Sequence, residues 1–314
     1  MAVYTPVSVD EVAAFLRDYN LGAYRDHQGI TQGVENTNYH LMTDRGRAIL
    51  TIFEKRTNPA DLPFVFGFTR HLGESGIAVP DAYPNQAGGL VGTLAGKPAS
   101  IIRYLDGAGM DDVDITPDMC AQLGLTLARM HLAAASFTDA RANPVGPDQW
   151  RQLLASAVPQ TDLVYPDLQN RIAGTFADYA ALDAAALPRG AVHADAFPDN
   201  VFFNDGRLSG VIDFYFACTD FYAYDVAMTV NAWCFNTTGV LVPARLAAFA
   251  AAYESVRPMA ASERAAFSTL RRAAALRIFA TRLYDWVFTP AGAQVTKKDP
   301  LEYAAKLKAD CTWP

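Results

Sequence analysis

Residues 190–203 read Gly190-Ala-Val-His193-Ala-Asp195-Ala-Phe-Pro-Asp-Asn200-Val-Phe-Phe203, and Leu208-Ser-Gly-Val-Ile-Asp213-Phe214 follows closely. An apolar run leads into a polar loop with His193, Asp195 and Asn200, and a short hairpin then ends at Asp213. Phosphoryl transfer needs a carboxylate near the acceptor hydroxyl, and an amide oxygen with a second carboxylate to hold Mg²⁺ against the phosphates. The pattern therefore predicts Asp195 as the catalytic carboxylate and Asn200 and Asp213 as the Mg²⁺ ligands.

The composition is that of a globular protein with enough apolar material for a core. The chain has 314 residues, of which 51% are hydrophobic and 19% charged, and this excludes disorder as the main state. At this length we expect two domains or one large one. The net charge is −7. A strong nucleic-acid or anionic-membrane binder would need a basic footprint that the chain lacks.

The cysteines and the N-terminal sequence bear on location. Cys120, Cys218, Cys234 and Cys311 form no Cys-x-x-Cys pair, so we expect neither a zinc ribbon nor a disulfide scaffold. The start has no basic segment followed by an apolar run, so it does not read as a signal peptide. We find no stretch near the roughly 20 apolar residues of a membrane span. These features predict reduced thiols and a cytoplasmic location.

Two regions with different patterns follow each other along the chain. The first has a capping box at Ser8 and Glu11, and it is otherwise rich in β signals. Its predicted elements are a helix over 8–20, strands over 24–31, 38–42 and 47–53, a helix over 59–76, and strands over 89–94 and 99–105. The second has helical spacing from 117, then at 147–156, 165–186, 220–235, 242–256 and 260–288, with a β-loop insertion at 190–213. We therefore predict an α+β chain with a small antiparallel-sheet lobe over 1–104 and a larger helical lobe over 105–314.

The motif His193-x-Asp195-x-x-x-x-Asn200, followed by Ile-Asp213-Phe, resembles the aminoglycoside phosphotransferase and choline kinase group, whose members share a bilobal, protein-kinase-like fold. Further blocks resemble the bacterial homoserine kinases of this fold, and the likeness covers nearly the full length; they are 32–39, 49–56, 211–220, 231–235, 281–286 and 298–303. The resemblance implies an enzyme that uses ATP and Mg²⁺ to phosphorylate the side-chain hydroxyl of L-homoserine, on the route to threonine.

The resemblance also implies where ATP binds. Residues 32–38 lie between the first two predicted strands, which suits a phosphate-covering turn, although an ordinary polar hairpin would also fit a segment with one glycine. By the resemblance, Gly33 and Asn36 become candidates for phosphate contacts and Asn38 for phosphate or substrate. The adenine is expected between the lobes, against the connector that includes Ile102 and Tyr104.

The third strand departs from the usual kinase pattern. The position that supplies the phosphate-binding lysine is Thr51, and the helix after it has no glutamate at the expected place. Lys55 points the same way as Thr51 on a strand, so it is the candidate replacement, with a solvated strand-end charge as the alternative. The missing pair favours a nucleotide-binding pseudokinase. The complete set of Asp195, Asn200 and Asp213 favours an active enzyme.

The acceptor site is expected in the helical lobe. The candidates form a polar and aromatic set: Tyr215, Asp220, Asn231, Trp233, Arg282 and Asp285. L-Homoserine is a zwitterion, so we expect Asp220 or Asp285 at its ammonium and Arg282 or Arg277 at its carboxylate. The alternative acceptors in the group are choline, which would need an aromatic cage, an aminoglycoside, which would need a denser acidic patch, and methylthioribose.

Three other polar residues are predicted to be structural. His131 lies on the apolar face of a helix and is expected to be a hydrogen-bonded core residue. His193 is expected to orient the loop, because Asp195 already supplies the base. Asp225 sits early in a helix, where a negative charge suits the helix dipole, and the resemblance implies that it braces the catalytic loop. The sequence makes no prediction of the oligomeric state.

Overall fold

The computed structural model describes residues 3–31, 36–54, 57–110, 114–289 and 297–314. The chain forms two compact units, Met1–Asp106 and Gly107–Pro314. The first contains α1 (Val9–Leu16), β1 (Tyr24–Gly29), β2 (Thr37–Thr43), β3 (Gly46–Ile52), α2 (Leu62–Glu74), β4 (Gly92–Leu94) and β5 (Lys97–Arg103). The second contains α3 (Pro117–Ala134), α4 (Pro147–Ala157), α5 (Pro166–Ala180), β6 (Arg189–Val192), β7 (Val201–Asn204), β8 (Arg207–Val211), β9 (Cys218–Phe221), α6 (Tyr222–Trp233), α7 (Pro243–Glu254), α8 (Ala261–Phe288) and α9 (Leu301–Lys308).

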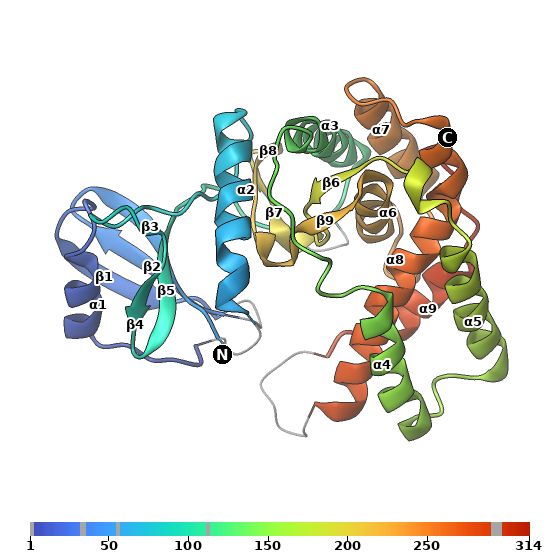
Figure 1. The fold of residues 1–314 in the computed structure, drawn as a ribbon, viewed down its shortest axis with the longest axis horizontal. Coiled ribbons are helices and arrows are strands. Elements are labelled where there is room, and N and C mark those ends of the chain that lie inside the picture. Colours follow the sequence, from blue (N-terminus) through green and yellow to red (C-terminus); the bar gives the residue numbers. More distant parts are fainter. Residues whose placement is uncertain (1–2, 32–35, 55–56, 111–113, 290–296) are drawn as a thin grey trace. The chain divides into compact units, whose positions relative to one another are not determined.

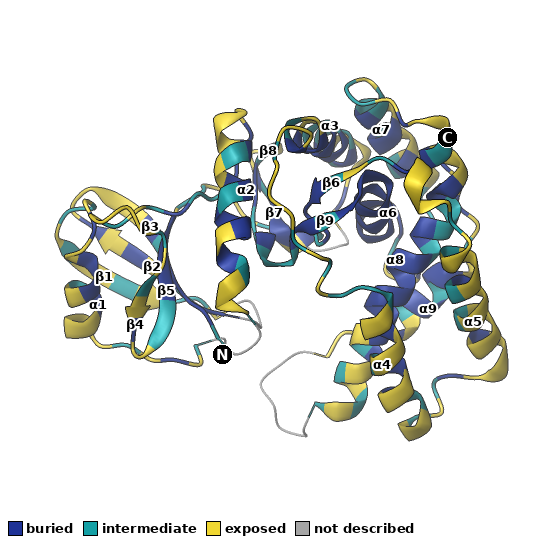
Figure 2. Cartoon of the chain, in the orientation of Figure 1, coloured by how far each residue is buried: buried dark blue, intermediate teal, exposed yellow. Residues whose placement is uncertain are grey.

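The first unit is built on a five-stranded antiparallel sheet with the order β1-β2-β3-β5-β4 (Figure 1). Alternate residues of the central strands, such as Leu41, Leu50 and Ile101, are buried together with Val12 and Phe15 of α1. This burial follows the period of two that the strand sequences show. The three predicted strands over 24–53 are thus confirmed, and Figure 2 shows the buried positions along them.

Helix α1 begins where the sequence predicts and ends earlier. Ser8 and Glu11 form the capping box, with the Ser8 N–H donating to Glu11 Oε2 at 2.8 Å. The helix stops at Leu16 rather than at residue 20, because the next N–H groups, those of Arg17 and Asp18, bond only three residues back. This tighter pattern ends the helix in a turn.

A polar cluster ties the N-terminal segment to the far end of the sheet. Glu54 Oε1 accepts hydrogen bonds from the hydroxyls of Thr5 and Thr37, each at 2.7 Å, and Oε2 forms an ion pair with Lys97. Lys97 Nζ also donates to Thr5 Oγ1 at 2.6 Å. Burial alone would raise the pKa of Glu54, but these partners, Lys97 foremost, outweigh it and the pKa is lowered. The carboxylate therefore stays ionised and joins three chain segments.

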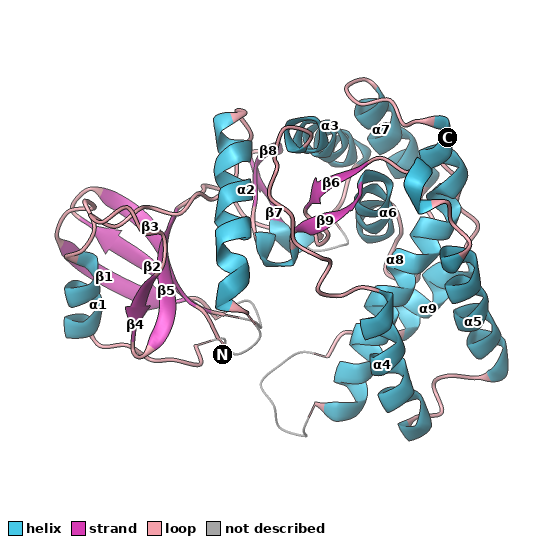
Figure 3. Cartoon of the chain, in the orientation of Figure 1, coloured by secondary structure: helices cyan, strands magenta, loops and turns pink. Residues whose placement is uncertain are grey.

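The second unit is mainly helical and carries two short antiparallel ribbons, β6–β9 and β7–β8 (Figure 3). All residues of α6 are buried, and α6 packs against α8 while α3 packs against α7. Strand β6 leads the chain into the loop that contains Asp195, and strand β7 leads the chain out of it. Among the described residues, no helix has the length and apolar character that crossing a membrane requires.

Three elements of the second unit differ from the prediction. The helix predicted over 165–186 ends at Ala180, because the carboxylate of Asp183 caps a separate short turn by accepting from the Ala185 N–H. The helix predicted over 220–235 begins at Tyr222, and the preceding residues form β9, which pairs with β6. Helix α9 was not predicted.

Candidate active site

The loop after β6 is held in shape by the buried carboxylate of Asp225. Asp225 Oδ1 accepts from the Ala194 N–H at 2.7 Å, and Oδ2 accepts from the His193 N–H at 3.1 Å. Ala194 has a φ of 61°, in the left-handed region that an alanine seldom adopts without support. The two hydrogen bonds supply that support, so Asp225 braces the loop as predicted.

His131 and His193 lie in the core around this brace. His131 Nε2 contacts Asp225 Oδ2 at 3.0 Å and Nδ1 contacts the Tyr253 hydroxyl at 2.8 Å, so the predicted core role of His131 is confirmed. His193 Nδ1 lies 3.1 Å from the Asp195 N–H, and Nε2 lies 2.9 Å from the Ile212 carbonyl. Burial lowers the pKa of both histidines. As a neutral ring, His193 accepts from one segment and donates to the other, which orients the loop.

Asp195 projects from this braced loop with its carboxylate partly accessible. Its side chain is 18% exposed, Oδ2 lies 3.3 Å from Asn200 Nδ2, and Oδ1 lies 3.4 Å from an Arg277 nitrogen. Burial raises the pKa of Asp195 to about 6, against the opposing effect of the Arg277 charge. At neutral pH the carboxylate is ionised, yet far more basic than an ordinary aspartate, as suits a proton acceptor.

Asn200 and Asp213 come to the same place from two directions. Asn200 donates its amide nitrogen to the Asp195 backbone carbonyl at 2.9 Å, which leaves its amide oxygen for another partner. The Ile212 N–H donates to the Asn200 carbonyl at 2.9 Å, and this bond sets Asp213 beside Asn200 in the chain fold. The structure therefore brings together the segments of Asp195, Asn200 and Asp213.

The chemistry of these donors fits a divalent cation. An amide oxygen and a carboxylate are ligands that Mg²⁺ prefers, and it usually takes only one or two of them from a protein, completing its shell with substrate phosphates and water. In the described parts of the chain, no group of three or more His, Cys, Asp or Glu side chains is arranged to hold a metal ion. A shared site with nucleotide phosphates suits this arrangement.

Arg277 is a second residue that holds the loop, and it does so through the carbonyl of Ala194. One guanidinium nitrogen donates to the Ala194 carbonyl and another approaches Asp195 Oδ1, while the side chain is only 3% exposed. The prediction that Arg277 meets a substrate carboxylate is not retained, because two of its nitrogens contact the loop and the side chain is almost fully buried. Its position between Leu276 and Ile278, both buried, was the one sequence signal of a buried arginine.

Several predicted acceptor residues are engaged elsewhere. Asn231 and Trp233 are fully buried, with Asn231 bonded to the Arg271 carbonyl and the Trp233 indole to the Ala196 carbonyl. Arg282 forms an ion pair with Glu302 at 2.6 Å. We do not retain Asn231, Trp233 or Arg282 as substrate contacts.

The remaining acceptor candidates, Asp220, Tyr215 and Asp285, differ in how far they are buried. The Asp220 carboxylate accepts a hydrogen bond from the Asn143 side-chain amide at 2.7 Å. In the β6–β9 ribbon Asp220 pairs with Gly190, whereas Cys218 pairs with Val192 at the end of β6 that leads into the catalytic loop. Asp220 lines a cavity of about 520 Å³ with Asn143 and Arg189. Tyr215 and Asp285 are half-buried.

In the first unit, the predicted nucleotide-binding residues Asn36 and Asn38 form hydrogen bonds with uncharged groups. Asn36 is buried, and its amide oxygen accepts from the Glu54 N–H at 3.1 Å. Asn38 Oδ1 accepts from the Thr51 hydroxyl at 2.7 Å, so an amide and a hydroxyl pair at the usual lysine position. Ile102 is buried in β5, and the Tyr104 ring lies under the Arg47 guanidinium, 4.2 Å from its centroid. The predicted phosphate contacts Gly33 and Lys55 lie outside the described residues.

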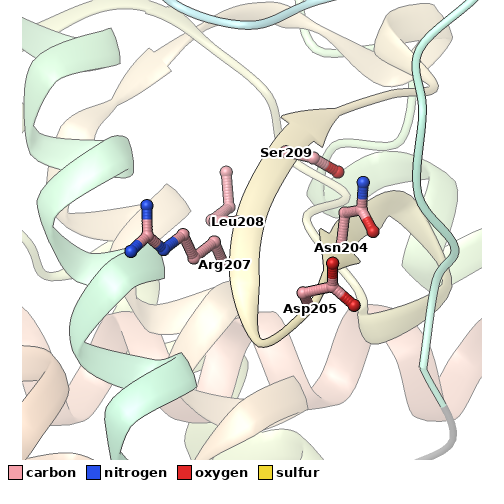
Figure 4. Close-up of a pocket in the computed structure, with 5 residues that line it drawn as sticks. All are labelled: Asn204, Asp205, Arg207, Leu208 and Ser209. Carbon is pink, nitrogen blue, oxygen red and sulfur yellow. The ribbon is translucent and has the colours of Figure 1, made fainter.

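A second cavity, of about 550 Å³, lies at the β7–β8 turn and contains none of the predicted site residues. Asn204, Asp205, Arg207, Leu208 and Ser209 line it. Figure 4 shows Arg207 extending to the opposite side of the hairpin from Asn204 and Asp205. The polar groups do not converge on one point, so we assign this cavity no role.

One charged pair beside the loop was not predicted. Lys298 Nζ lies 3.6 Å from Asp199 Oδ2, and Asp199 directly precedes Asn200. Lys298 begins the block 298–303 that carries part of the family resemblance, and this was the available signal. The sequence alone could not place that block against the loop.

Comparison with known proteins defines the class. A model of the phosphotransferase enzyme family matches residues 26–259. The solved structure of an amicoumacin kinase in complex with AMP-PNP and Ca²⁺ has a TM-score of 0.72 at 15% identity, covering 96% of this chain and 92% of that one. A likeness at that identity shows the bilobal α+β fold alone. The chain belongs to the phosphotransferase enzyme family.

The particular relatives are homoserine kinases. The homoserine kinase of Azorhizobium caulinodans is 46% identical over 308 residues, covering 98% of this chain and 95% of that protein. The homoserine kinase of Gluconacetobacter diazotrophicus is 46% identical over 310 residues, covering 98% and 96%. The predicted resemblance is confirmed, and the chain is an enzyme, a kinase of a family that uses ATP.

Proposed function

We propose that this enzyme transfers the γ-phosphoryl group of ATP to the side-chain hydroxyl of L-homoserine, giving O-phospho-L-homoserine for threonine biosynthesis. The observation that carries the proposal is 46% identity to homoserine kinases over 98% of the chain. The loop geometry supports it, because Asp195, Asn200 and the segment of Asp213 lie together as phosphoryl transfer requires. We further propose a cytoplasmic location, where the four free, buried cysteines would stay reduced.

In this proposal Asp195 orients the acceptor hydroxyl and accepts its proton as the oxygen attacks phosphorus. Its raised pKa makes it a better proton acceptor than an exposed aspartate, while it is still mostly ionised at pH 7. The bracing hydrogen bonds, which Asp225 accepts from the loop backbone and Arg277 donates to it, fix the carboxylate before substrate binds. Fixed position contributes much of the rate when the transition state is loose.

Asn200 and Asp213 would hold Mg²⁺ through the amide oxygen and the carboxylate. When bound there, the ion would supply positive charge that stabilises the negative charge developing on the phosphates. The contacts from Asn200 to Asp195 keep the proton acceptor and the metal ligand in one rigid unit.

We also propose that the lobe over 1–104 binds the nucleotide and that the lobe over 105–314 carries the catalytic and acceptor groups. In the first lobe, Asn38 and Thr51 offer neutral polar contacts. Gly33, Asn36 and Lys55 stay predictions for the phosphates, as do Ile102 and Tyr104 for the adenine.

The test is ATP consumption by the purified enzyme with Mg²⁺ over a panel of acceptors. We expect turnover with L-homoserine and little with L-serine, choline or kanamycin. Preferred turnover of choline or kanamycin would replace the substrate assignment while keeping the kinase assignment. Nucleotide binding without consumption for any acceptor would instead favour a pseudokinase.

A further inference from the structure

An accessible pair of opposite charges lies at the rim of the catalytic loop. Lys298 Nζ and Asp199 Oδ2 are 3.6 Å apart, and their side chains are 59% and 64% exposed. The backbone under Asp199 is fixed, because the Met110 N–H donates to the Pro198 carbonyl at 3.0 Å. At Gly109 an added Cβ would lie 2.6 Å from the Asp199 carbonyl, so the two segments are in direct contact. The backbone that carries Asp199 is thus anchored to the segment of Gly109 and Met110.

The pair lies beside the reacting loop. Asp199 directly precedes Asn200, whose side chain contacts Asp195, and Lys298 reaches Asp199 from a segment far along the chain. Arg277 is committed to the loop and Arg282 to Glu302. Among the described residues, Lys298 is an exposed cation at this loop, so a ligand can reach it.

We propose that Lys298 and Asp199 bind the head group of the amino-acid acceptor, Lys298 at its carboxylate and Asp199 at its ammonium. This inference rests on the proposed function, since it concerns how a zwitterion is recognised. A short aliphatic chain joins that head group to the hydroxyl, which places the hydroxyl toward Asp195.

The energetics favour such an exchange. An exposed ion pair contributes only about 0–1 kcal/mol to stability, so Lys298 and Asp199 can separate at small cost in free energy. A bound zwitterion replaces the single contact with two charge-assisted ones. The same arrangement predicts selection against amino alcohols, because an acceptor without a carboxylate would leave Lys298 without its ligand partner.

The experiment crosses two variants with three acceptors. Lys298→Met keeps the aliphatic stem and removes the charge, and Asp199→Asn removes the negative charge at nearly constant shape. Lys297→Met is the matched control, because the Lys297 ammonium instead donates to the Trp286 carbonyl at 2.9 Å. The acceptors are L-homoserine, 3-aminopropan-1-ol, which lacks the carboxylate, and 4-hydroxybutanoate, which lacks the ammonium. Each analogue is measured by kcat/KM, or by its Ki against L-homoserine where turnover is too low.

The proposal predicts a crossed pattern. Lys298→Met raises KM about tenfold or more for L-homoserine and weakens 4-hydroxybutanoate similarly, but leaves 3-aminopropan-1-ol unchanged. Asp199→Asn weakens L-homoserine and 3-aminopropan-1-ol and spares 4-hydroxybutanoate. Lys298→Arg recovers most of the affinity, Lys297→Met matches the wild type, and KM for ATP stays unchanged in all variants.

Two results would overturn the proposal and leave the proposed function intact. One is a wild-type enzyme active on L-homoserine whose constants do not change in Lys298→Met. The other is a Lys298→Met enzyme with reduced kcat for all acceptors or a raised KM for ATP, which would assign Lys298 to the phosphates. A wild-type enzyme inactive on L-homoserine would refute the proposed function itself.

Discussion

Replacing Asp225 with asparagine tests whether one buried carboxylate shapes the catalytic loop. Its two oxygens serve three donors, the N–H groups of His193 and Ala194 and the ring of His131. Burial would raise its pKa, but these donors, His131 foremost, lower it, so the carboxylate is ionised throughout the neutral range. In Asp225→Asn, one oxygen becomes an NH₂ group that faces a donor.

The magnitude follows from counting these contacts. Whichever way the amide turns, at least one buried backbone N–H loses its acceptor, which costs about 1–3 kcal/mol. The contacts that survive change from charge-assisted to neutral, and each loses about 1 kcal/mol. We therefore expect Asp225→Asn to lower the free energy of unfolding by about 3–5 kcal/mol, within the range for breaking a buried charged network.

The assay is urea unfolding at pH 7.5, followed by tryptophan fluorescence, with kcat measured on the folded fraction. The control is Asp139→Asn, which changes an exposed carboxylate and should alter stability by no more than about 0.5 kcal/mol. We expect kcat to fall as well, because the left-handed turn at Ala194 carries Asp195. A loss below about 1 kcal/mol with unchanged kcat would refute the reasoning.

Three further outcomes are expected. Asp195→Asn should lower kcat a hundredfold or more while KM for ATP stays near the wild-type value; retained turnover would show that Asp195 is not the base. Asp213→Ala should weaken Mg·ATP binding, measured by calorimetry, much more than adenosine binding, whereas equal weakening would indicate a folding defect. Burial lowers the folded-state pKa of His131 and His193, so the unfolded chain takes up protons that the folded chain rejects. Stability should be full above pH 6.5 and fall below it by up to about 1.4 kcal/mol per pH unit for each histidine, with protonation of Asp195 offsetting part of this loss below about pH 6; urea midpoints that do not change from pH 7.5 to 5.5 would contradict this.

Local signals predicted the elements whose causes are local. The strand at 46–52 follows from alternation and a turn, and the start of α1 follows from the side-chain bonds between Ser8 and Glu11. Strand β9 has four residues and runs directly into α6, so its apolar pattern merged with that of the helix. Strand β9 pairs with β6, which lies far earlier in the sequence, so local sequence patterns could not reveal this contact.

For the candidate site too, residues close together in the sequence could be predicted, and residues from distant segments could not. Asp195 and Asn200 share one short loop, so their spacing alone placed them together. Arg277 reaches that loop across 82 residues of chain, and Lys298 comes from a still later segment. Their residue types allowed many roles, and only the packing of α8 and the segment before α9 selected one. For Asn231 and Trp233, a polar and an aromatic residue looked like ligand contacts because the sequence did not show that both face the core.

The polar cluster around Glu54 has a consequence for the order of synthesis on the ribosome. Thr5 bonds to Glu54 and to Lys97, which lie 49 and 92 residues further along the chain. The contact between Thr5 and Lys97 cannot form until Lys97 has left the exit tunnel, so the cluster is complete only once the fifth strand begins to emerge. A pause in translation before residue 97 would therefore prolong the time for which the cluster lacks the Lys97 cation.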